Sequence, residues 1–118
     1  MLDINKAKDF VKNNNLTRAI TTSKIRKFLS AVNKISNKIR YQNNSDILSE
    51  DIVAEIAYMR VQFAYIVGKD NKNEGLKKLH KELDDAIANI NKNKNEFINF
   101  AKYVEAIVAY HKFYGGRD

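Results

Sequence analysis

The best candidates in this 118-residue chain for binding a charged partner are cations that share one face of a predicted helix. A helix is expected from residue 22 onward, and the cations opposite its apolar stripe are Lys27, Lys34 and Lys38. Cations repeated at seven and four residues can follow a phosphate backbone, with little dependence on base sequence. Lys24, Arg26 and Arg40 flank the row, and Tyr41 beside it could stack on an exposed base. The simpler alternative is a solvated helix face.

The net positive charge of the chain is confined to its first 48 residues. The formal charge is +7, from 21 basic and 14 acidic side chains. Residues 1–48 hold ten basic and three acidic side chains, and residues 49–118 hold eleven of each. A surface charged only for solubility would more often spread its cations. The asymmetry therefore favours a polyanionic partner, most often a nucleic acid.

Tyrosines form a second set of candidate contact residues. Tyr58 and Tyr65 lie seven residues apart, and Tyr103, Tyr110 and Tyr114 follow at spacings of seven and four. Both rows fall beside an apolar stripe. This placement suits packing at a rim, with each hydroxyl in water. It suits equally a protein–protein contact surface, where tyrosine is favoured, so both interpretations stay open.

Catalytic and metal-binding constellations are not predicted. The chain has no cysteine, which excludes thiolate nucleophiles, thiolate metal ligands and disulfides. His80 with Asp84 offers two metal ligands at best, so we predict neither a metal nor another cofactor. His111 falls on an apolar stripe and is expected to be a core histidine. Two histidines without supporting groups do not make an acid–base pair, and we predict that the chain is not an enzyme.

These residues must be positioned by helices. The chain has no proline and only four glycines, a composition that favours long uninterrupted helices. We predict an all-α fold: a single domain over residues 1–118 formed by a compact bundle of about five helices. A short N-terminal helix and a connector, residues 1–21, should precede a helical core over residues 22–114. Thr22 is the expected cap of the first core helix.

The next core helix should begin after a cap at Ser49 and end at Gly68. Apolar side chains cover most of its circumference, which predicts a helix at the centre of the bundle. Further along, the apolar stripe keeps its heptad register through residues 91–95, so one helix of about 60 Å is possible. We favour two helices that break at this Asn-rich cluster. Gly115 and Gly116 should end the last helix.

The chain has no apolar run of about 20 residues and no signal-peptide pattern. We therefore expect a soluble cytoplasmic protein without a membrane partner.

Three stretches resemble a known family, the small subunit of type III-A CRISPR effector complexes (the Csm family). Residues 103–116, YVEAIVAYHKFYGG, are similar to the terminal block of that subunit. Residues 21–29, TTSKIRKFL, look like the start of its second helix, and residues 60–65, RVQFAY, look like its central helix. The resemblance covers most of the chain from residue 21 onward, and its last block is the most distinctive.

The resemblance implies a non-catalytic helical subunit that acts in antiviral defence. Several copies would line a ribonucleoprotein filament, beside backbone and large subunits, and would contact guide RNA and target RNA. The implied RNA-binding face consists of Lys24, Arg26, Lys27, Lys34 and Lys38, with Arg60 as a further candidate. The alternative function is a helical protein–protein adaptor with an incidental basic surface.

Overall fold

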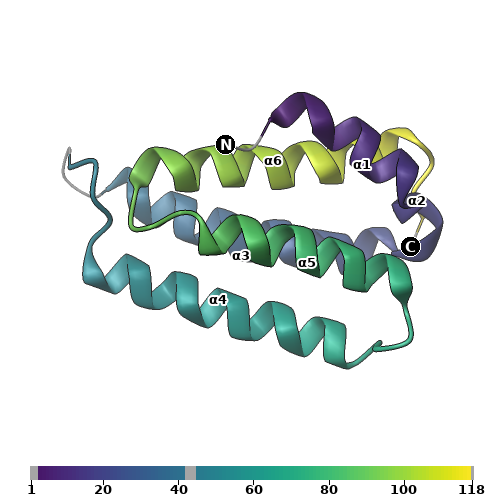
Figure 1. Ribbon diagram of the computed structural model, residues 1–118, viewed down its shortest axis with the longest axis horizontal. Helices are drawn as coiled ribbons and strands as arrows, with labels where there is room; N and C mark the ends of the chain where they lie inside the picture. The colour runs from purple at the N-terminus through teal and green to yellow at the C-terminus, as the bar shows by residue number, and fades with distance from the viewer. Residues whose placement is uncertain (1–2, 42–44, 118) are drawn as a thin grey trace.

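The chain folds into a bundle of helices, here described from a computed structural model over residues 3–41 and 45–117. Within these ranges there are six α-helices, one 3-10 helix and no β-strand, which confirms the all-α prediction. In chain order they are η1 (Ile4–Lys6), α1 (Ala7–Asn13), α2 (Leu16–Ala19), α3 (Thr22–Arg40), α4 (Glu50–Gly68), α5 (Glu74–Ala88) and α6 (Lys94–Phe113), as shown in Figure 1. The extra helix is α2, which forms within the predicted connector. None of the described helices combines the length and apolarity that crossing a bilayer requires.

Polar side chains cap the long helices at the residues where they begin. The hydroxyl of Thr21 accepts a hydrogen bond from the backbone N–H of Lys24 at 3.1 Å. Thr22, the predicted cap, is instead the first residue of α3, and its side chain is buried. Ser49 caps α4 as predicted and accepts from the N–H of Ile52 at 3.3 Å.

The two predicted glycine stops behave differently. Helix α4 ends at Gly68 as predicted, but Gly68 is its last helical residue and does not adopt the left-handed conformation of a glycine stop. The backbone N–H of the next residue, Lys69, still bonds to the carbonyl of Tyr65. Gly115 follows the end of α6 with a φ of 96°, the left-handed conformation that glycine adopts without strain. The predicted stop after α6 is confirmed.

The predicted break in the Asn-rich cluster is also confirmed. Helix α5 ends at Ala88, and Asn91 and Lys92 adopt left-handed φ angles of 49° and 63° that turn the chain back. The new helix α6 then starts with Asn93, whose side chain accepts from the N–H of Glu96 at 3.0 Å. Backbone hydrogen bonds of 2.8 and 2.9 Å tie this turn to the segment before α4, Leu48 to Lys92 and Lys94 to Asp46.

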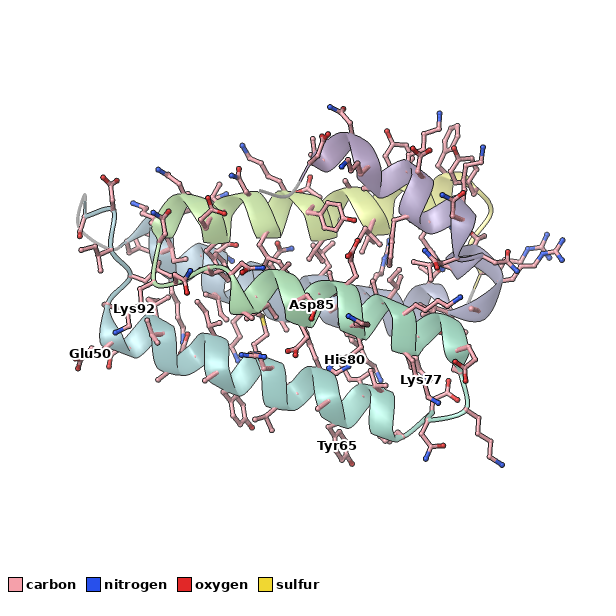
Figure 2. All side chains as sticks on the ribbon, viewed as in Figure 1. Glu50, Tyr65, Lys77, His80, Asp85 and Lys92 are labelled. Carbon is pink, nitrogen blue, oxygen red and sulfur yellow. The ribbon has the colours of Figure 1, made fainter. Side chains whose placement is uncertain are left out.

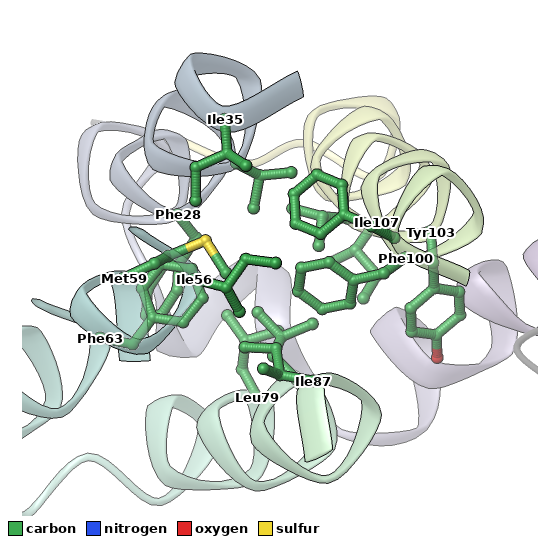
Figure 3. Packing of buried hydrophobic residues seen from close by; sticks show 14 of the residues in the cluster. Phe28, Ile35, Ile56, Met59, Phe63, Leu79, Ile87, Phe100, Tyr103 and Ile107 are labelled. Carbon is green, nitrogen blue, oxygen red and sulfur yellow. The ribbon is translucent and has the colours of Figure 1, made fainter. Parts of the chain in front are cut away.

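Helix α6, not α4, has the central position. Among the described helices, α6 packs on η1, α1, α2, α3 and α5, whereas α4 contacts α3 and α5 and lies along the lower edge in Figure 1. The buried side of α4 contributes Met59 and Phe63 to the core, where the ring of Phe63 lies 4.7 Å from that of Phe28 (Figure 3). The prediction of a central α4 was wrong because its second apolar face is exposed to solvent.

Candidate nucleic-acid interface

A groove of about 810 Å³ runs between α3 and α4 on the outside of the bundle. Its α3 wall carries Arg26, Lys27 and Lys34, and its α4 wall carries Tyr58, Val61 and Tyr65. The exposed fractions of Tyr58, Val61 and Tyr65 are 64%, 62% and 67%. The α3–α4 groove therefore has one cationic wall and one aromatic and apolar wall.

The apolar stripe of α3 determines how its cations are presented. Phe28 and Ile35 are buried against the core, with exposed fractions of 0% and 4%. Successive helical residues are about 100° apart, so the residues preceding these two, Lys27 and Lys34, lie toward the edge of the buried face and not directly opposite it as the sequence pattern predicted. They are exposed there, beside α4.

Two ion pairs join α3 to α4 and to the turn that follows it. The ammonium group of Lys24 lies 3.1 Å from a carboxylate oxygen of Asp70, and Lys38 pairs with Glu55. The side-chain amide of Asn73 and the ammonium of Lys24 hold the pKa of the Asp70 carboxyl below its ordinary value. Since residue numbers rise along α3 as they fall along α4 in these pairs, the two helices are antiparallel.

The predicted cationic residues of α3 therefore divide into three groups. Lys24 and Lys38 are engaged in the ion pairs. Arg26, Lys27 and Lys34 line the groove, and within the part of the chain that the structure describes they have no ion-pair partner. Arg40 and Tyr41 lie beyond it at the end of α3, where Tyr41 is 91% exposed.

Arg60 belongs to a different contact from the cations of α3. Its guanidinium donates two hydrogen bonds to the carboxylate of Asp84 on α5, at 2.8 and 3.0 Å. The hydrogen bonds from Arg60 hold the pKa of Asp84 below its ordinary value. Arg60 thus lies on the α5 side of α4 and joins these two helices, and the structure does not bring it to the groove.

The tyrosines predicted as contact residues also differ in how exposed they are. Tyr58 and Tyr65 are exposed on α4, and Figure 2 shows Tyr65 projecting from α4 away from the bundle. Tyr103 is not at a rim: it is 3% exposed, and its hydroxyl donates to a carboxylate oxygen of Glu82 at 2.8 Å. Burial, together with this carboxylate, raises the pKa of the Tyr103 phenol. Its candidacy as a contact residue is corrected, because α6 is covered on that side.

Tyr110 and Tyr114 belong to an aromatic cluster at the end of α6. Their rings are 6.3 Å apart, and the ring of Phe113 lies 5.1 Å from that of Tyr114. Phe113 is 76% exposed. Sequence reasoning missed it because it falls off the apolar stripe, although a large aromatic residue off the stripe is itself a signal of exposure.

His111 is the core histidine that the sequence predicted. It is fully buried, and its Nε2 lies 2.6 Å from the carbonyl oxygen of Ile20. Its Nδ1 is buried without a hydrogen-bond partner among the described atoms. Over the ranges 3–41 and 45–117, no three His, Asp or Glu side chains are grouped so that they could hold a metal ion.

Two surface ion pairs lie along α5. Lys81 pairs with Asp85 at 2.8 Å, whereas Glu74 pairs with Lys77 at 3.4 Å. These contacts neutralise cations on α5 locally. In the α3–α4 groove, by contrast, cations of the α3 wall without an ion-pair partner among the described residues lie across from exposed rings of the α4 wall.

The fold and the groove define a class: small helical proteins with a cationic and aromatic groove on one side of a bundle. The comparisons with known proteins are more specific. The family described as Csm2 Type III-A matches residues 3–117. The chain therefore belongs to the Csm2 family of type III-A CRISPR systems, which confirms its resemblance to the small subunit of the effector complex.

Individual relatives agree with this assignment. A protein of Enterococcus italicus named "CRISPR system Cms protein Csm2" is 33% identical, over 97% of this chain and 90% of its own length. A protein of the same name from Streptococcus thermophilus is 34% identical, over 91% and 83%. One from Mycobacterium tuberculosis is 25% identical, over 84% and 78%.

Proposed function

We propose that this chain is a non-catalytic subunit that lines a type III-A CRISPR ribonucleoprotein filament and contacts guide or target RNA through α3. The observation that carries the proposal is the set of exposed cations Arg26, Lys27 and Lys34 on that helix, which have no ion-pair partner among the residues that the structure describes. They belong to the first 48 residues, which account for the whole net charge. Cations spaced along one helix face suit a phosphate backbone.

The ion pairs indicate which of the other predicted RNA-binding residues are available to a phosphate. Lys24 and Lys38 already face carboxylates, so each would have to exchange a protein partner for a phosphate. Arg40 and Tyr41 extend the exposed face at the end of α3. Arg60 is held by Asp84 and contributes least.

A non-catalytic role is supported by the surroundings of the two histidines. His111 is fully buried against the carbonyl oxygen of Ile20, so it cannot reach a bound RNA. His80 is partly exposed on α5, outside the α3–α4 groove. A two-histidine acid–base mechanism needs both side chains near the same scissile bond.

The alternative function, a helical protein–protein adaptor, is favoured by the aromatic cluster at the end of α6, in which Phe113 is exposed and Tyr110 and Tyr114 are half-buried beside it. Such a surface suits contact with backbone or large subunits or with another copy of the chain. An assembly subunit can carry both surfaces. The two functions differ in whether the chain binds RNA at all.

Charge reversal of the groove cations tests the proposal. We expect Lys27→Glu with Lys34→Glu to weaken RNA binding by the full-length chain at least tenfold. The slope of log affinity against log salt should become shallower by about 1.4, since each phosphate contact on a single strand contributes about 0.7. The measurement is fluorescence anisotropy with labelled RNA across a salt series. Lys78→Glu with Lys102→Glu is the control, because it changes the net charge equally at exposed positions on α5 and α6.

Two results would count against RNA binding through α3. Equal loss in both double variants would mean that total charge, and not the α3 face, determines binding. A parent chain that ignores RNA but binds the other subunits of the complex would support the adaptor instead.

A further inference from the structure

We infer that the α3–α4 groove takes RNA as a single strand, with bases stacked on Tyr58 and Tyr65 and phosphates held by Lys27 and Lys34. This inference rests on the proposed function and deepens it. It gives a role to exposed α4 side chains that the sequence assigned to protein contacts or to the core. It also specifies which form of RNA the groove binds.

The register of the two helices brings each tyrosine ring to the level of one lysine of the groove. Lys38 pairs with Glu55, and the ring of Phe28 lies 4.7 Å from that of Phe63, so positions on α3 and α4 that face each other have residue numbers that add to about 91 to 93. By that rule Lys27 lies roughly level with Tyr65, and Lys34 lies roughly level with Tyr58. All four residues line the groove.

The repeat along the groove suits a short polynucleotide. The two lysines are seven residues apart, as are the two tyrosines, which is about 10 Å along each helix. That distance corresponds to about three stacked nucleotides at 3.4 Å each. The ion pairs at the two ends are fourteen α3 residues apart, so the groove between them is about 21 Å long. About six nucleotides would fit that length.

The exposed rings distinguish a single strand from a duplex. In a duplex the base faces are stacked inside the helix, and proteins reach mainly phosphates and 2′-hydroxyls. Single strands offer base faces to aromatic side chains, as in other proteins that bind them. Tyr58 and Tyr65 are about two-thirds exposed, and Val61 between them is 62% exposed, so an apolar surface is available for stacked bases.

The charges in the groove favour RNA over a protein partner. Arg26, Lys27 and Lys34 have no carboxylate partner among the described residues, and the carboxylate of the groove, Glu55, is already paired with Lys38. The ammonium group of Lys69 lies 5.3 Å from the centre of the Tyr65 ring, which adds a cation at one end. A partner that is anionic throughout and also carries flat apolar faces satisfies both walls, and single-stranded RNA has both properties.

Substitution of the two rings tests the inference. In the full-length chain, Tyr58→Leu with Tyr65→Leu should weaken binding to a 12-nucleotide single-stranded RNA by about tenfold to a hundredfold. The salt slope should stay unchanged, because no phosphate contact is lost. The parent should bind a duplex of the same sequence more weakly than the single strand, and the variant should bind that duplex as the parent does. Phe113→Leu, an exposed aromatic position outside the groove, is the control.

The outcomes separate this inference from the proposed function. If the lysine variants weaken binding and the tyrosine variant does not, the groove inference is wrong and the α3 face stands. Equal affinity of the parent for duplex and single strand would also overturn it. If no RNA binds the parent, the proposed function itself fails. A tyrosine variant that keeps its RNA affinity but loses the other subunits would show a protein-docking groove; circular dichroism would confirm that each variant is folded.

Discussion

At the scale of single residues, similar side chains have different roles according to what lies across the helix interface. Lys24 and Lys27 are about one helical turn apart on α3, yet Lys24 forms an ion pair with Asp70 while Lys27 lines the open groove. Arg60 meets the carboxylate of Asp84 in a two-point contact. An ion pair reduces the availability of a cation for phosphate, so the local partner decides which cations are candidates for binding.

We expect Arg60→Met to lower the free energy of unfolding by about 1 kcal/mol at pH 7, the upper end for a partly exposed pair. RNA affinity should change less than twofold. Urea denaturation and RNA titration measure the two effects. Arg40→Met is the stability control, because Arg40 is exposed and has no ion-pair partner in the described chain.

The same pair should make the effect of Arg60→Met depend on pH. Arg60 lowers the pKa of Asp84 in the folded chain. A carboxyl whose pKa is lower in the folded chain than in the unfolded chain stabilises the fold at any pH above the unfolded pKa, which is about 4. That stabilisation is lost as the pH falls through the pKa of the folded chain. The difference between parent and Arg60→Met should therefore shrink below about pH 4. A difference that persists undiminished at pH 2 would contradict this account.

At the scale of elements, the end of α6 is fixed by close packing around His111. Gly116 lies against the imidazole ring, and its backbone N–H donates to the carbonyl of His111 at 2.9 Å. A β-carbon at residue 116 would overlap both the ring and that carbonyl oxygen. The neighbouring Gly115 is required for another reason, its left-handed φ of 96°.

Three glycine-to-alanine substitutions should therefore change the stability of the chain in different directions. We expect Gly116→Ala to destabilise the chain by about 2 kcal/mol through overpacking, and Gly115→Ala by about 1 kcal/mol through backbone strain. Gly68→Ala should be neutral or stabilising by up to about 1 kcal/mol, because residue 68 is helical and has open space around it. Thermal unfolding measures all three. A Gly116→Ala variant as stable as Gly68→Ala would refute the close packing.

At the scale of the whole molecule, the N-terminal segment is part of the core. Ala7, Val11, Leu16 and Ile20 are all at most 1% exposed, and α1 packs on α6. The carbonyl of Ile20 meets His111, and the N–H of Thr22 donates to the carbonyl of Arg117 at 3.0 Å. These contacts join the end of the N-terminal segment to the C-terminal end of the described chain.

A chain shortened to residues 22–118 should consequently lose cooperative unfolding. Removal of the N-terminal segment would expose the apolar side of α6 and leave His111 without its hydrogen-bond partner. Urea denaturation followed by circular dichroism tests this, with Ile20→Ala in the full chain as a milder variant that should keep one cooperative transition. A shortened chain as stable as the full one would show that residues 22–118 form an independent core.

The sequence by itself determined the local features of this protein. The absence of proline and the spacing of apolar residues specify helices, Ser49 specifies where α4 begins, and the Asn-rich cluster specifies the break between α5 and α6. The motifs at residues 21–29, 60–65 and 103–116 indicated the family, and the comparison with known proteins confirmed it. These signals lie in short segments, so they can be read without knowing which helices meet.

Only the tertiary structure decided which surfaces are buried and which face each other across the groove. The pattern of α4 could not tell burial on all sides from an exposed apolar face, and Tyr103 could not be told from Tyr58, because exposure depends on which helix lies opposite. Nor could the sequence show that Lys27 and Lys34 lie across a groove from Tyr65 and Tyr58. That arrangement depends on the pairing of α3 with α4, and pairing between helices is set by packing over the whole bundle.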